Sequence, residues 1–162
     1  MPWGVKVLGV SFLVLAAFAI VVISPAGSTR TTMRTARCPN GKPPTRTITK
    51  IQSIQLDLIR RSSFNNFDGP LVARELLQHR PLWCAAILDR LGDDALIKLR
   101  DIDANYWNTD TLYILSSGAN NRALSALARH WRADATQWVK GAAASQLLGT
   151  SGQYQILEVW WD

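Results

Sequence analysis

The apolar and polar positions along residues 48–162 recur in short patterns that predict a series of strands and helices. In residues 48–61, Ile54, Leu56 and Leu58 stand at alternate positions, which favours a strand, although Ile51, Ile54 and Leu58 also fit helical spacing. A polar loop follows. It ends at Asp68, a helix-capping residue, with Pro70 in the first turn of the helix expected next.

Two consecutive helices are expected over residues 70–80 and 81–91, because Pro81 interrupts the first pattern and fits the first turn of a second. Residues 95–102 alternate between apolar and polar positions and are predicted to form a strand. Residues 110–117 are rich in β-forming side chains and are predicted to form another strand.

The clearest helix is predicted over residues 120–131, where apolar side chains recur at i, i+3, i+4 and i+7. Residues 135–140 favour a strand, residues 142–149 a short helix that ends at Gly149, and residues 154–161 a final strand. This order predicts one small α/β domain with a mixed sheet and crossover helices, with a mixed α+β arrangement as the alternative.

An uncharged run over residues 7–29 precedes the domain. Its apolar core, residues 7–23, reaches the minimum length of a transmembrane helix and exceeds the usual core of a signal peptide. We therefore expect residues 1–26 to form a single-pass membrane anchor that contacts the membrane through residues 7–24. Two alternatives stay open, namely a signal peptide that is cleaved off and a true translation start at Met33.

Charge divides the chain into a basic tail and a nearly neutral domain. The formal net charge is +6, and six Lys and Arg lie between residues 30 and 50 without an acidic residue. Residues 51–162 carry eleven Lys and Arg against twelve Asp and Glu, a net charge of −1. Residues 27–47 are expected to form a basic, Pro/Thr-rich flexible linker, and residues 48–162 the globular domain. Such a domain offers no electrostatic surface for nucleic acid, whereas the tail can attract anionic lipid.

The side of the membrane stays open at this stage. The basic tail after the apolar run favours a cytoplasmic domain, whereas a cleaved signal peptide would place the domain outside the cytoplasm. The two cysteines, Cys38 and Cys84, lack the spacing of a metal site. A disulfide between them would fit an oxidising compartment, but the apolar run around Cys84 favours a buried thiol there.

The most suggestive polar stretch lies between two predicted strands. Asp101, Asp103 and Asn105 have a D-x-D-x-N spacing, which in a tight loop can direct oxygens at a divalent cation. The full EF-hand pattern is not met, because its glycine and its final glutamate are replaced. A metal-dependent enzyme would therefore use these residues, with Asp110, to hold a cation beside a phosphorylated substrate. A polar turn is the simpler interpretation.

Two further groups are candidates for binding. Arg60 and Arg61 precede a Ser- and Asn-rich loop and can bind an anion near the helix that follows. Trp107 lies among polar residues and, with Trp160 or Trp161, is the best candidate for an exposed binding anchor. No phosphate-binding glycine loop or nucleophile elbow is present, so no catalytic residue is assigned.

The sequence therefore predicts a non-enzymatic interaction or structural domain, tethered to a membrane or exported, with a protein partner and no required cofactor. A small metal-dependent enzyme that uses Asp101, Asp103 and Asp110 is the alternative. A third reading is a soluble cytoplasmic protein that starts at Met33 and binds nucleic acid through its basic arm.

Overall fold

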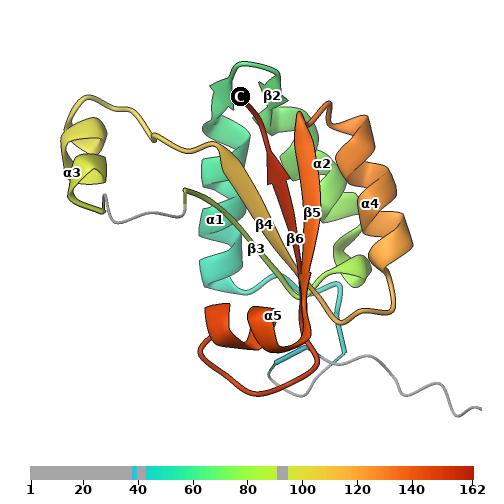
Figure 1. The fold of residues 1–162 in the computed structure, drawn as a ribbon. Helices are drawn as coiled ribbons and strands as arrows, with labels where there is room; N and C mark the ends of the chain where they lie inside the picture. The colour runs from blue at the N-terminus through green and yellow to red at the C-terminus, as the bar shows by residue number, and fades with distance from the viewer. Residues whose placement is uncertain (1–37, 40–42, 91–94) are drawn as a thin grey trace, which may run out of the picture. The chain divides into compact units, whose positions relative to one another are not determined.

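The computed structural model describes residues 38–39, 43–90 and 95–162, and the expected membrane anchor lies outside these residues. The described part is mixed α/β, with five α-helices and two antiparallel sheets (Figure 1). No helix in it is long and apolar enough to cross a bilayer. The helices are α1 (Lys50–Arg61), α2 (Gly69–Gln78), α3 (Ala95–Asp103), α4 (Asn121–His130) and α5 (Gly141–Leu147).

The main sheet has four strands in the order β3-β4-β6-β5, and every neighbouring pair is antiparallel. The expectation of a mixed sheet is wrong, because β6 inserts between β4 and β5 and runs antiparallel to both. A short hairpin of β1 (Ser63–Phe64) and β2 (Phe67–Asp68) joins α1 to α2. The main strands are β3 (Ala85–Asp89), β4 (Thr111–Ser116), β5 (Ala135–Lys140) and β6 (Gln155–Trp160).

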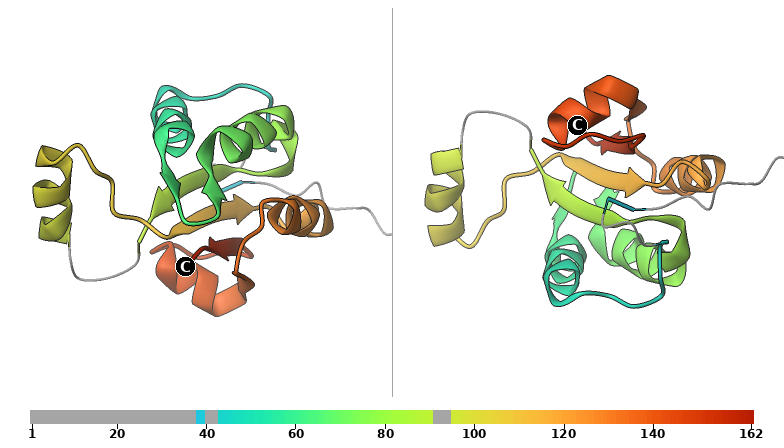
Figure 2. Two further views of the ribbon diagram at one scale, coloured as in Figure 1. Left: turned by 90° about the horizontal axis from the view of Figure 1, so that it is seen from above. Right: turned by 90° about the horizontal axis from the view of Figure 1, so that it is seen from below.

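The core lies between one face of the main sheet and the helices α1, α2 and α4. Figure 2 shows α1 and α2 on one side of the sheet and α5 on the other. Trp83, Trp131 and Trp161 are fully buried, and the Trp161 indole donates to the carbonyl of Trp131 at 3.2 Å. The buried aliphatic side chains around them include Leu56, Ile59, Val72, Leu76, Leu88, Leu112, Ile114, Leu124, Leu157 and Val159.

Several predicted elements are confirmed. The helix expected after the polar loop is α2, and Asp68 caps it by accepting a hydrogen bond from the amide of Leu71 at 2.9 Å. Pro70 lies in its first turn, as expected. The patterns of α4, α5, β4, β5 and β6 also match the structure, with boundaries that differ by a few residues.

The strand expected within residues 48–61 is wrong, because α1 forms there. Thr49 caps this helix by accepting a hydrogen bond from the Gln52 amide at 3.2 Å. Gln52 is buried, whereas Ile51 and Ile54 are exposed. The alternating pattern gives the wrong prediction here because α1 buries a polar side chain and exposes two apolar ones to solvent.

The helix expected at residues 81–91 is also wrong. A single 3-10 turn, Arg80–Leu82, leads to the buried Trp83, and β3 follows. The amide of Cys84 donates to the carbonyl of Leu115 at 2.7 Å and begins the pairing with β4. A short apolar run does not distinguish a buried helix from a buried strand by periodicity, so long-range pairing decides its structure.

A third expectation, the strand at residues 95–102, is replaced by α3. Its apolar residues Leu96, Leu99 and Ile102 lie three positions apart, which fits a helix as well as the partial alternation fits a strand. The helix places all three in solvent.

Cys38 and Cys84 form a disulfide, with their Cα atoms 5.5 Å apart. The expectation of a buried free thiol at Cys84 is therefore wrong. Cys38 belongs to the range expected as a flexible linker, yet it is buried and covalently bonded to the residue before β3. The tail and the sheet are thus joined at the start of β3.

Candidate functional site

α3 stands apart from the rest of the described fold (Figures 1 and 2). It makes only sparse contacts with the other elements. Leu96, Leu99 and Ile102 are 78%, 64% and 55% exposed, and Tyr106 in the following loop is also exposed. We call residues 95–107 the α3 arm. The side chains of Leu96, Leu99, Ile102 and Tyr106 are available for contact with another molecule.

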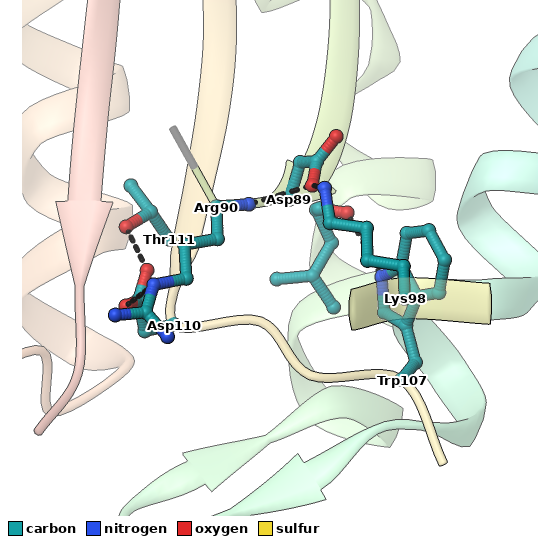
Figure 3. Close-up of polar contacts among 7 residues, drawn as sticks. Asp89, Arg90, Lys98, Trp107, Asp110 and Thr111 are labelled. Carbon is teal, nitrogen blue, oxygen red and sulfur yellow. Dashed lines mark hydrogen bonds and ion pairs between the residues drawn. The ribbon is translucent and has the colours of Figure 1, made fainter. Parts of the chain in front are cut away.

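Charged residues join the two ends of the segment that carries the α3 arm (Figure 3). The Arg90 guanidinium, just after β3, lies 3.6 Å from the Asp110 carboxylate, just before β4. Asp110 also accepts a hydrogen bond from the Thr111 hydroxyl at 2.6 Å. These contacts join the end of β3 to the start of β4, at the base of the arm.

The arm itself is attached to this base by Lys98 and Trp107 (Figure 3). The Lys98 ammonium pairs with the carboxylate of Asp89, at the end of β3, and lies 5.5 Å from the centre of the Trp107 ring. The Trp107 indole donates to the carbonyl of Leu88 at 3.2 Å. Both ends of the arm therefore reach the last residues of β3, which limits its freedom to move away.

A hollow of about 550 Å³ lies between the arm and the end of α1. We call it the Trp107 hollow. Its walls combine a guanidinium, two serine hydroxyls, a tyrosine hydroxyl, an amide, aromatic rings and aliphatic side chains. They come from Leu58, Arg61, Ser62, Ser63, Phe64, Ile102, Asn105, Tyr106 and Trp107.

The two arginines proposed for binding are placed differently. Arg61 lines the Trp107 hollow, whereas Arg60 does not. Both bind Asp57, Arg60 at 2.9 Å and Arg61 at 2.8 Å. The hydrogen bond to Asp57 raises the pKa of Arg61, and the hydrogen bond from Arg61 lowers the pKa of Asp57. Two guanidinium groups share one carboxylate, so a net positive charge remains at this end of α1.

The proposed metal residues lie on a helix end rather than in a tight loop. Asp101 and Asp103 are two positions apart in the last turn of α3, and side chains at i and i+2 do not face each other. Asp101 is bound by Arg100, at 2.6 Å, and Asn105 lies past the helix end among the walls of the hollow. Among the described residues, no three His, Cys, Asp or Glu side chains are placed to share a metal ion. The metal hypothesis stays untested and gains no support from this placement.

The structure thus brings Arg61 to one hollow with Asn105 and Trp107, which lie in a segment far from Arg61 in the sequence. The place of Tyr106 at this hollow and the attachment of Lys98 to Asp89 were not predicted from the sequence. The spacing of Leu96, Leu99 and Ile102 in the sequence could have predicted this apolar face. It does so only if the segment is a helix, because residues three positions apart then lie on one side.

Comparison of the chain with protein-family models, with curated proteins and with solved structures found no match.

Proposed function

We propose that the protein is a non-enzymatic interaction domain, tethered to a membrane through residues 7–24, that binds a protein partner with the α3 arm. The exposure of Leu96, Leu99 and Ile102 on one helical face carries this proposal. An apolar helix face presented to solvent is the element that helix-in-groove recognition uses. Contiguous exposed apolar side chains of this kind mark interaction sites on soluble domains.

The Trp107 hollow suggests the chemistry of the partner. Its apolar walls, such as Leu58 and Ile102, suit an apolar side chain of the partner. Arg61 adds a guanidinium whose charge Asp57 balances only in part, because Arg60 shares the same carboxylate. A partner segment that combines an apolar residue with a nearby carboxylate therefore suits the arm and the hollow together.

The disulfide favours a location of the domain on the side of the membrane away from the cytoplasm. Structural disulfides persist in oxidising compartments and are rare in the cytosol. The Cys38–Cys84 bond joins the tail to the sheet, so the domain suits a compartment in which this bond can form. We infer that the domain lies outside the cytoplasm, against the charge bias of the tail.

Photocrosslinking in the full-length protein tests whether a partner protein contacts the α3 arm. A photoreactive amino acid is placed at Leu99 on the arm or, as a control, at the exposed Arg122 on α4. Irradiation of intact cells should give one discrete adduct from position 99 and none of the same mass from position 122. The substitution Ile102→Asp, which adds a charge at an exposed position of the same face, should abolish the adduct.

Two results would overturn the proposal. An adduct at position 99 that persists in the Ile102→Asp background would mean that the apolar face does not carry the contact. An adduct with twice the mass of the chain would mean self-association and would remove the separate partner.

A further inference from the structure

Among the residues that the structure describes, the second face of the main sheet is covered only at one end. α1, α2 and α4 pack on the opposite face, and α5 reaches this face through Leu147 and Leu148 beside Ile156. Figure 1 shows β5 and β6 unobstructed above α5. Ile87 and Trp160 on this face are 41% and 36% exposed. An antiparallel sheet tolerates one solvated face, but that face is usually polar.

A hollow of about 370 Å³ lies on this open face, and we call it the aromatic–acid hollow. Strand pairing fixes how its residues are arranged. Glu158 on β6 is flanked by Tyr113 on β4 and by Gln137 on β5, as direct cross-strand partners. Trp160 lies two positions further along β6 and therefore on the same face as Glu158. Cross-strand neighbours have Cβ atoms about 5 Å apart, so a carboxylate and two aromatic rings surround one small space.

Glu158 is the only charged residue among the walls that the structure describes, which are Thr111, Tyr113, Ala135, Thr136, Gln137, Glu158 and Trp160. Gln137 donates a hydrogen bond to Oε2 of Glu158. A carboxylate has several acceptor positions on its two oxygens, so Glu158 can accept further hydrogen bonds from a ligand. A cation gains both from a carboxylate and from the faces of Trp and Tyr rings, whereas an anion gains from neither.

A second hollow of about 290 Å³ adjoins the first and shares Tyr113 with it. Its walls are mostly aliphatic, and they include Ile87, Leu115 and Leu147. Asp89 is the only charged residue among its described walls and is already paired with Lys98. No cationic side chain from the described parts of the chain lines either hollow. The open face thus offers an acidic, aromatic space next to an apolar one.

We infer that the open face of the sheet binds a peptide segment of a protein partner that carries an arginine or lysine beside an apolar residue. The basic group lies against Trp160 and bonds to Glu158. The apolar residue occupies the adjoining hollow. Among the described residues, a single carboxylate lines this hollow, and no three His, Cys, Asp or Glu side chains gather to hold a metal ion. The paired hollows match two neighbouring side chains better than a single small cation. This site does not depend on the α3 arm, so either proposal can fail without the other.

The test uses the full-length protein in uncharged detergent micelles and follows the indole N–H signal of Trp160 by NMR. The probe is the capped peptide acetyl-Ala-Arg-Leu-amide, and acetyl-Ala-Glu-Leu-amide is its control. The arginine peptide should shift the Trp160 signal to saturation, and salt should weaken its binding. The glutamate peptide should not shift it. Trp160→Leu identifies the signal.

Glu158→Gln should weaken binding of the arginine peptide about tenfold, because a charge-assisted hydrogen bond is replaced by a neutral one. Asp103→Asn, which removes an exposed carboxylate from the arm, should leave the affinity unchanged. Unchanged signals from the other indoles would show that the variants are folded. The inference is overturned if the arginine peptide causes no saturable shift, or if Glu158→Gln binds it as tightly as the parent protein.

Discussion

The side-chain amide of Gln52 exchanges two hydrogen bonds with the backbone of Ala86. Gln52 Nε2 donates to the carbonyl at 2.8 Å, and the Ala86 amide donates to Gln52 Oε1 at 3.0 Å. β3 is an edge strand, so its outward backbone groups have no neighbouring strand to pair with. Gln52 therefore takes the place of a strand residue and fixes α1 against the edge of the sheet.

Gln52→Leu should lower the free energy of unfolding by about 2–4 kcal/mol, because the N–H and C=O of Ala86 then lose their partners in a buried setting. Denaturant unfolding measures the change. Gln55→Leu on the same helix is the matched control, because Gln55 Oε1 is already buried without a partner among the described residues. That variant should be neutral or stabilising. Equal losses in both would refute a specific role for the Gln52 pair.

Glu75 links α2 to the end of α4 and should make stability depend on pH. Its carboxylate accepts a hydrogen bond from the Trp131 indole at 2.8 Å and lies 3.0 Å from His130 Nδ1. Burial raises the pKa of Glu75, but the hydrogen bonds from His130 and Trp131 outweigh this effect, so the pKa lies below its ordinary value. The ionised carboxylate is therefore favoured in the folded state.

Because the folded pKa is lowered, this contribution is complete above the unfolded pKa of about 4.3 and is lost as the pH falls through the folded pKa. Unfolding free energies measured between pH 3 and 7 should fall at the acid end. In Glu75→Gln the fall should be smaller, and stability near neutral pH should drop by about 1 kcal/mol. Parallel pH curves for the two proteins would contradict this assignment.

The disulfide should contribute about 4 kcal/mol to stability, because the two cysteines are separated by 46 residues and the bond restricts the unfolded chain. The double variant Cys38→Ser, Cys84→Ser should unfold at correspondingly lower denaturant. Without reductant, a thiol-alkylating reagent should add no mass to the denatured protein purified from its host. After reduction it should add two adducts. Two adducts without reductant would mean free thiols and a reducing compartment.

The ion pair between Asp89 and Lys98 should restrain the α3 arm. Asp89→Asn removes a charge-assisted contact worth about 1 kcal/mol, so backbone amides of α3 should exchange with solvent about fivefold faster. Hydrogen-exchange mass spectrometry of the α3 peptide measures this rate. Asp103→Asn on the same helix is the control and should leave exchange unchanged. No difference between the two variants would mean that other contacts hold the arm.

The sequence pattern predicts an element well where its buried face is apolar and its exposed face is polar. α4 satisfies this condition, with Leu124 and Ala128 fully buried. α1 violates it, because Gln52 is inside while Ile51 is in solvent. No local rule identifies Gln52 as buried, since its partner Ala86 lies 34 residues away.

The candidate site is predictable only in part for the same reason. Arg61 and Trp107 were selected by residue type, but their meeting at one hollow depends on the arm that α3 forms. Glu75 illustrates a similar limit. Its sequence neighbour at helical spacing is His79, yet the structure pairs it with His130 on another helix. Such partners follow from helix packing, which a single sequence does not encode locally.

The covalent bond at Cys84 also decides how mechanical force would travel through the domain. If the N-terminal segment is held in a membrane and the α3 arm is held by a partner, tension between them enters at Cys38 and crosses directly to Cys84. It then runs along β3 into the arm. Residues 39–83, which contain α1, the hairpin and α2, lie within the loop that the disulfide closes and carry no load while it is intact.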